Sequence, residues 1–257
     1  MLSVALHQVA SSREPAANRA ALTGLVDASG DADLVVLPEA FARDFGSPGE
    51  EVAAEAEPLD GPFVEALIGC AAAQGGVWVA GMFERSEDPD RPYNTLVAVD
   101  ADGVRASYRK IHLYDSFGYR ESDRLLAGPA TPTTLDVAGA TVGLMTCYDL
   151  RFPELARRLV DAGAEVLLLP AAWVAGPRKV RHWQHLVVAR AIEDVCWVAA
   201  VGQPEPRYSG HSRVVDPRGD VVAELGGGAG TLRAVVDTGL VAVARAENPS
   251  LTNRRDW

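Results

Sequence analysis

Cysteine is scarce in this chain of 257 residues, which contains only Cys70, Cys147 and Cys196. Secreted scaffolds that depend on disulfides carry dense sets of cysteines, so three scattered residues favour free thiols in a reducing compartment. The first nine residues lack a basic segment followed by a long apolar core, and nowhere do eighteen apolar residues run together. We therefore predict a soluble cytoplasmic protein with no membrane as partner.

Basic residues are also in deficit. The chain has 24 Lys and Arg against 35 Asp and Glu, which gives a formal charge of −11 at pH 7 and a pI near 4.9. Nucleic acids and anionic membrane surfaces repel an acidic protein, so the composition argues against both as partners. A small molecule is the expected ligand.

Short apolar runs alternate with amphipathic stretches almost from end to end, which is the pattern of an α/β fold. The length and the 48% of hydrophobic residues fit one domain over residues 1–257. Strands are expected at 2–9, 33–38, 76–83, 94–100, 103–108, 133–137, 140–146, 165–170, 195–201, 211–216, 219–224 and 231–237. Helices are expected at 15–28, 61–74, 153–162, 179–193 and 238–246. Polar residues at the carboxyl ends of parallel strands should converge on a pocket.

Cys147 stands where a buried strand, 140–146, gives way to a helix whose first turns begin at Pro153. Backbone N–H groups near the start of a helix lower the pKa of a thiol and can hold an oxyanion. This position favours a nucleophile, although a lone cysteine is more often a small buried apolar residue.

Two charged residues stand at the ends of other strands. Glu39 closes the run that begins at Leu34, and Lys110 follows the strand at 103–108. A carboxylate at such a place is costly to desolvate unless a cation is nearby, so Glu39 and Lys110 can satisfy each other. Near a thiol, the glutamate suits a general base and the lysine suits an oxyanion stabiliser. Taken singly, Glu39 is also explained as a helix cap or loop salt bridge, and Lys110 as a solvated strand end.

These residues lie in three blocks that resemble the signature motifs of the nitrilase superfamily of carbon–nitrogen hydrolases. The blocks are Leu37-Pro-Glu39-Ala-Phe41, Tyr108-Arg-Lys110-Ile-His-Leu113 and Cys147-Tyr-Asp-Leu-Arg-Phe-Pro-Glu-Leu155. Segments 189–193, 210–219 and 254–257 are similar to later blocks of the family, so the resemblance spans nearly the whole chain. It implies a four-layer α-β-β-α sandwich without cofactor or metal. It also implies a homodimer formed through a helical layer, with 153–162 and the C-terminal tail as contributors.

The resemblance implies a role for each of these residues. Glu39 would be the base, Lys110 the oxyanion stabiliser and Cys147 the nucleophile. Glu121 matches a second glutamate that the family places beside the lysine, and Tyr148 would offer its backbone N–H to the oxyanion. The implied reaction hydrolyses a small carboxamide through a cysteine thioester and releases ammonia and a carboxylic acid.

Within the superfamily, the third block and the elements Gly176-Pro177 and His182-Trp183 look most like the Nit-type amidases, the branch of ω-amidase and deaminated-glutathione amidase. The intervening residues 178–181 depart from that branch and alter the expected pocket rim. Candidate substrate contacts are Arg151, Trp173, His182 and Trp183. For the arginine, solvation or an internal ion pair is an equal alternative, and the tryptophans also suit a core. Hydrolysis of N-carbamoyl amino acids or nitriles, and a non-catalytic binding protein, remain alternatives.

Overall fold

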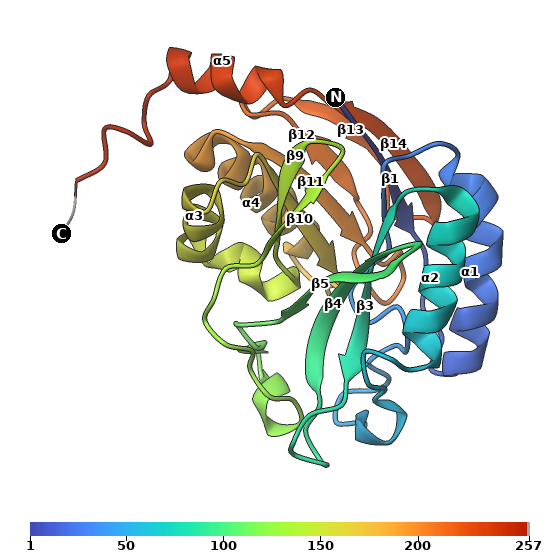
Figure 1. Ribbon diagram of the computed structural model, residues 1–257. Helices are drawn as coiled ribbons and strands as arrows, with labels where there is room; N and C mark the ends of the chain where they lie inside the picture. Colours follow the sequence, from blue (N-terminus) through green and yellow to red (C-terminus); the bar gives the residue numbers. More distant parts are fainter. Residues whose placement is uncertain (256–257) are drawn as a thin grey trace.

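Two six-stranded mixed sheets form the centre of the structure, a computed structural model that describes residues 1–255 (Figure 1). The first sheet has the order β14-β1-β2-β3-β4-β5. Its strands are β1 (Leu2–Gln8), β2 (Leu34–Val36), β3 (Val77–Glu84), β4 (Tyr93–Asp100), β5 (Gly103–Arg109) and β14 (Gly230–Val236). The second sheet has the order β13-β12-β11-β10-β9-β8. Its strands are β8 (Thr134–Val137), β9 (Ala140–Leu144), β10 (Val166–Ala171), β11 (Trp197–Gly202), β12 (Arg213–Val215) and β13 (Val221–Glu224).

The alternation of side chains along the strands creates two apolar layers. In β2 the side chains of Leu34 and Val36 join the core shared by the two sheets, whereas Val35 points to the other face. In β3 Val79 joins the shared core, and Trp78 packs on the outer side with residues of the helices. Because successive side chains of a strand point to opposite faces, an apolar strand of this kind can be buried on both sides.

Helices cover the outer faces of both sheets. Figure 1 shows α1 (Pro15–Ser29) and α2 (Pro62–Gln74) side by side on the first sheet, and α3 (Pro153–Asp161) and α4 (Lys179–Asp194) on the second. The last helix is α5 (Gly239–Glu247). A proline stands in the first turn of α1, α2 and α3, where its missing N–H leaves no intrahelical bond unmade. The predicted four-layer α-β-β-α sandwich is therefore confirmed.

Every predicted strand and helix is found, with ends that differ by at most two residues. The sequence did not indicate the short hairpin of β6 (Asp115–Ser116) and β7 (Tyr119–Arg120), nor the 3-10 helices η1 (Ala53–Glu55), η2 (Glu121–Asp123) and η3 (Cys147–Arg151). No helix among the described residues has the length and apolar character that crossing a lipid bilayer requires.

The two sheets share one plan, which brings distant residues to a common edge. Strands β1, β2 and β3 are parallel neighbours in the first sheet, as are β9, β10 and β11 in the second. The residues that follow β2, β9 and β10 lie at the carboxyl ends of these strands, and the residues that follow β5 lie in the same region. The residues that follow these strands form the site described below.

The imidazole of His7 on β1 is fully buried, and its burial predicts a pH-dependent stability. Burial, helped by the charge of Arg233, lowers the pKa of His7 from 6.5 to about 4. The unfolded chain therefore binds a proton between about pH 6.5 and 4 that the folded chain does not, so stability falls as the pH drops through this window. The loss should reach about 3 kcal/mol.

Urea unfolding of the native protein and of His7→Asn at pH 7.5, 6 and 5 tests this expectation. The variant removes the titrating ring, so its unfolding free energy should fall less steeply across the window. Other titrating groups contribute equally to both proteins. If the unfolding free energy of the two proteins falls equally steeply with pH, His7 is not the cause of the pH dependence.

Candidate active site

Four side chains from separate parts of the chain meet in one buried cluster. Lys110 Nζ lies 3.0 Å from Glu39 Oε1 and 2.9 Å from Glu121 Oε2. Lys110, Glu39 and Glu121 are each at most 2% exposed, and Cys147 is 8% exposed. Hydrogen bonding to Glu39 and charge interactions with both other groups act on the Cys147 thiol. The predicted mutual satisfaction of Glu39 and Lys110 is thus found, with Glu121 as a second carboxylate.

Glu39 is held in place by both of its carboxylate oxygens. Oε1 accepts a hydrogen bond from Asn94 Nδ2 at 2.8 Å, and Oε2 accepts one from the Ala172 N–H at 2.7 Å. The turn at Glu39 packs directly on Gly81 of β3, where a Cβ would lie 2.4 Å from the Ala40 backbone nitrogen. Only glycine allows so close an approach of the two backbones.

The backbone at Cys147 departs from the expected strand-to-helix junction. The 3-10 helix η3 begins at Cys147 and precedes α3, so the thiol stands at the start of this short turn, and Pro153 begins the next helix. Cys147 has a φ of +46°, in the left-handed region that costs a non-glycine residue about 1–2 kcal/mol. Such a backbone needs support from its surroundings.

Asp149 supplies that support. Its fully buried carboxylate accepts hydrogen bonds from the Thr146 N–H at 2.9 Å and the Tyr108 hydroxyl at 2.7 Å, and it lies 2.7 Å from His112 Nδ1. Tyr108 and His112 flank Lys110 in the sequence. One carboxylate therefore joins the turn that carries the thiol to the segment that carries the lysine.

The electrostatics of the cluster keep the resting thiol protonated. Burial raises the pKa of Cys147 well above its ordinary value, Glu39 raises it further, and Lys110 opposes both. Burial disfavours the ammonium form of Lys110, but the charges of Glu121 and Glu39 outweigh it and raise the pKa of Lys110 well above its usual range. The cluster therefore combines a neutral thiol, a cation and two carboxylates.

Sequence reasoning missed two polar residues of this site. Asn94 Nδ2 donates to Glu121 Oε1 at 3.1 Å as well as to Glu39, so it lies between the two carboxylates. Polar site residues were expected at the carboxyl ends of strands. Asn94 was missed because β4 is antiparallel to β3, so the first residues of β4 lie at the site. Asp149 lies inside the cysteine motif, but nothing in its spacing indicates its partners.

The predicted substrate contacts have different surroundings. Arg151 and His182 line a pocket of about 330 Å³, and their side chains lie 3.4 Å apart. The Arg151 guanidinium lies 4.9 Å from the centre of the Trp173 ring. Trp183 is fully buried behind Trp173, and its indole N–H donates to the His211 carbonyl. Trp183 has no free surface in this arrangement, so the structure corrects its assignment from substrate contact to core.

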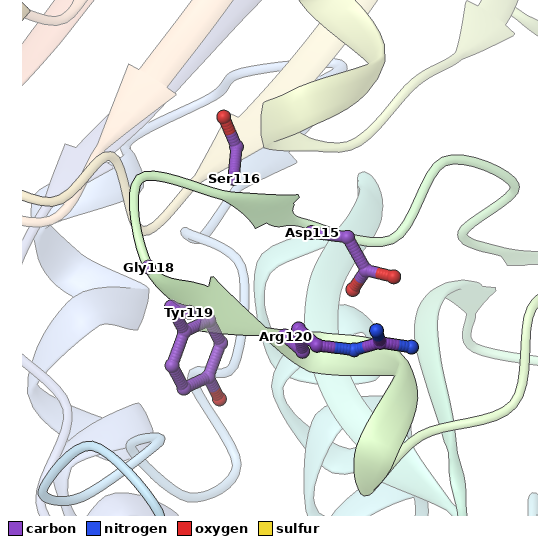
Figure 2. Close-up of a pocket in the computed structure, with 5 residues that line it drawn as sticks. All are labelled: Asp115, Ser116, Gly118, Tyr119 and Arg120. Atoms are coloured by element: carbon purple, nitrogen blue, oxygen red, sulfur yellow. The ribbon is translucent and has the colours of Figure 1, made fainter.

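The hairpin β6–β7 forms a second pocket, of about 410 Å³ (Figure 2). Asp115 and Arg120 pair across the hairpin, and Figure 2 shows the Asp115 carboxylate and the Arg120 side chain on the same side, with the Tyr119 ring at the other end of β7, next to Gly118. The next residue is Glu121, so the hairpin connects directly to the buried cluster. Within residues 1–255, no three His, Cys, Asp or Glu side chains are grouped as metal ligands.

Comparison with known proteins identifies the class to which this fold and site belong. The family model for carbon–nitrogen hydrolases matches residues 3–246, so the chain belongs to the carbon–nitrogen hydrolase family, and the predicted class of enzyme is confirmed. The chain is 40% identical over 228 residues to the deaminated glutathione amidase of Escherichia coli O157:H7, covering 89% of this chain and 87% of that protein.

Two solved structures show the same fold. XC1258 from Xanthomonas campestris, a CN-hydrolase superfamily protein with an arsenic adduct in its active site, superposes with a TM-score of 0.88 at 29% identity, covering 100% of this chain and 98% of that chain. An amidase mutant from Nesterenkonia sp. AN1, in which leucine replaces a glutamate, superposes with a TM-score of 0.81 at 27% identity, covering 99% and 94%. Its active-site cysteine carries the acetamide moiety of fluoroacetamide.

Proposed function

We propose that this chain is an amidase that hydrolyses the C–N bond of a small carboxamide, with Cys147 as nucleophile, Glu39 as general base and Lys110 as oxyanion stabiliser. The observation that carries the proposal is the buried ammonium of Lys110, which bonds two carboxylates beside a buried thiol. We also propose that residues 1–257 act as one catalytic domain.

The first half of the reaction forms a thioester. Glu39 takes the proton of the Cys147 thiol as the sulfur attacks the carboxamide carbon. An ionised carboxylate has about four acceptor sites. Lys110, Asn94 and the Ala172 N–H occupy three sites on Glu39, which leaves one for the proton. The tetrahedral intermediate then collapses, Glu39 gives its proton to the leaving nitrogen, and ammonia departs.

The oxyanion of this intermediate lies between Lys110 and the backbone N–H of Tyr148. Lys110 Nζ donates to Glu39 Oε1 at 3.0 Å and to both oxygens of Glu121, at 2.9 Å and 3.2 Å. An ammonium has three N–H donors. We propose that the longer Glu121 contact is given up, so that its N–H binds the oxyanion. The Tyr148 N–H belongs to the first turn of η3, where backbone donors have no partner within the helix. Losing one such donor costs about 3–4 kcal/mol of transition-state stabilisation.

The second half of the reaction releases the acid. Glu39 takes a proton from water, the resulting hydroxide attacks the thioester carbon, and the Cys147 sulfur leaves and regains a proton from Glu39. Glu121 supports both halves, because it fixes Lys110 without touching the reacting carbon. Its carboxylate is held by Asn94 and by the Tyr114 N–H, which leaves Glu121 little freedom to act as the base itself.

Ammonia release from a substrate panel tests the proposed reaction. The panel comprises small carboxamides including 2-oxoglutaramate, deaminated glutathione, N-carbamoyl amino acids and simple nitriles. The name of the bacterial relative supports an amide as the preferred member. Intact-mass measurement under rapid quench should show an acyl adduct on Cys147. Failure to release ammonia or form an adduct with any member would favour a binding protein that retains the fold.

We propose further that the protein is a cytoplasmic homodimer that pairs through the layer of α3. All three cysteines are free thiols, which supports a reducing compartment. The predicted contribution of the C-terminal tail falls partly on residues 256–257, which lie outside the described residues. Light scattering after gel filtration measures the assembly, and a single-chain mass would contradict the dimer.

A further inference from the structure

The side chain of Asn94 is fully buried near the start of β4, a strand that lies between β3 and β5 in the first sheet (Figure 1). Its backbone is fixed on both sides. Asn94 pairs with Phe83 of β3, and its carbonyl accepts a hydrogen bond from the Lys110 N–H at 2.8 Å. The amide group of Asn94 therefore has a fixed position beside the proposed oxyanion stabiliser.

The amide of Asn94 uses its donors and leaves its acceptor unpaired. Nδ2 donates to Glu39 Oε1 at 2.8 Å and to Glu121 Oε1 at 3.1 Å. Within residues 1–255, Oδ1 is buried and has no hydrogen-bond partner. Because buried polar atoms usually find a partner, the two carboxylates fix the orientation of this amide. A side-chain amide offers two N–H donors without a charge, whereas a hydroxyl offers one donor.

The hydrogen bond from Asn94 distinguishes the two oxygens of Glu39. Oε1 accepts bonds from Lys110 Nζ at 3.0 Å and from Asn94 Nδ2, which fills the two acceptor sites of that oxygen. Among the described residues, Oε2 accepts one bond, from the Ala172 N–H at 2.7 Å. The free acceptor site of Glu39 is therefore on Oε2.

The same amide also separates Glu39 from Glu121. Glu121 Oε1 accepts bonds from Asn94 Nδ2 and, at 3.2 Å, from Lys110 Nζ. When Lys110 gives up this longer contact for the oxyanion, Asn94 still donates to Glu121 Oε1. Without that N–H, two carboxylates would share one buried space, and like charges so placed favour a shared proton. A proton held there would neutralise the base.

We propose that Asn94 is a positioning residue, which directs the thiol proton to Glu39 Oε2 and prevents Glu39 and Glu121 from sharing a proton. This inference rests on the proposed role of Glu39 as general base and adds a residue to that mechanism. Asn94 acts through the two carboxylates and not on the substrate.

The surroundings of the carboxylates make the pH dependence of the reaction a suitable measurement. Within residues 1–255, the titratable side chains that interact with Glu39 or Glu121 are Lys110, Tyr119, Cys147 and Tyr208. The pKa of each of these groups is raised, so between about pH 5 and 9 the lysine stays charged and the other three stay neutral. A change of rate in this range therefore reports on the carboxylates.

Alkylation of Cys147 by iodoacetamide tests the proposal without requiring turnover. The sulfur displaces iodide and forms the S–C bond, while Glu39 takes the thiol proton and passes it to water. Peptide mass mapping measures the rate at Cys147 from about pH 5 to 9. Asn94→Leu removes both donors at similar side-chain size. The fall in rate towards low pH should move to higher pH by at least about one unit, because a shared proton must first be lost.

Turnover should change in the same way. With the best carboxamide at pH 7, Asn94→Leu should lower kcat about 100-fold and leave KM nearly unchanged, since general-base catalysis contributes about 10²–10⁴-fold and the substrate contacts remain. Raising the pH should recover part of this loss.

Two comparisons distinguish this role from packing. In a Glu121→Gln background the second carboxylate is absent, so Asn94→Leu should move the alkylation profile at most about half as far. Thr95→Val removes a donor from the next buried residue of β4, whose hydroxyl bonds Glu84 Oε2 at 2.8 Å, and should leave the profile in place. An equal shift in both Glu121 backgrounds, or an equal shift with Thr95→Val, would overturn the proposal.

The two readouts separate this inference from the proposed function. If Asn94→Leu moves the alkylation profile but the native protein releases no ammonia from any amide, the role of Asn94 stands and the amidase function fails. If the native protein hydrolyses amides and Asn94→Leu lowers the rates equally at every pH, the amidase function stands and the role of Asn94 is overturned.

Discussion

Cys147→Ala is expected to lower ammonia release from the best carboxamide by at least about 10⁴-fold, because no thioester can form without the sulfur. The substitution removes one small side chain from a tightly held turn, so the folded structure should persist. The variant should also show no acyl adduct by intact mass, while its ability to bind substrate remains. A coupled ammonia assay at matched protein concentrations measures the loss.

The two other cysteines provide matched controls. Burial raises the pKa of both Cys70 and Cys196. Cys70 belongs to the apolar core on the helix side of the first sheet, and the charged groups that act on Cys196 are Asp194, Arg245 and Arg157. Cys70→Ala and Cys196→Ala should therefore keep the turnover of the native protein. Undiminished activity in Cys147→Ala would contradict a thioester on Cys147. Loss of activity in only one of the control variants would identify that cysteine as the nucleophile instead.

The fold was predictable because its signals are local. The apolar run of β10 and the Pro-initiated helix α3 are each visible within about ten residues of sequence. The turn between β4 and β5, at Asp100 and Gly103, falls between the strands predicted at 94–100 and 103–108. The arrangement of the sheets into four layers was inferred from family resemblance, since neither periodicity nor spacing states which faces pack together.

The sequence predicted those site residues whose reactive or charged side chains stand at the end of a strand. Glu39 and Cys147 each follow an apolar run and Lys110 follows a strand, which makes them visible. Asn94 is an ordinary polar residue beside Tyr93, and its importance follows from two carboxylates 55 and 27 residues away in the chain.

The assignment of Trp183 fails for a related reason. A tryptophan beside a histidine near an expected pocket suits a ligand contact, although large aromatic residues more often fill the core. Its indole N–H has a carbonyl partner at 2.8 Å on a distant segment, His211. The local sequence pattern cannot reveal a hydrogen bond between residues so far apart in the chain. Here that bond favours the core position of Trp183 over a contact with substrate.

Lys110→Met is expected to reduce turnover by at least about 10³-fold, since it removes both the proposed oxyanion donor and the cation that bonds Glu39. It also leaves Glu39 and Glu121 buried without their counter-charge. Breaking one partner of a buried ion pair typically costs about 3–5 kcal/mol, so the unfolding free energy should fall by about this amount. Urea unfolding and ammonia release measure the two effects on the same samples. A thiol enzyme built on a Cys–His pair would largely tolerate the loss of this lysine.

The double variant Lys110→Met with Glu121→Gln separates the structural effect from the chemical one. Neutralising Glu121 removes one of the two unpaired carboxylates, while the amide can still accept the Tyr114 N–H bond. The double variant should therefore regain part of the lost stability, yet remain as inactive as Lys110→Met, because no donor replaces the ammonium at the oxyanion. Recovery of activity together with stability would mean that Lys110 acts only as a structural counter-ion, and the role proposed for it in the reaction would have to be abandoned.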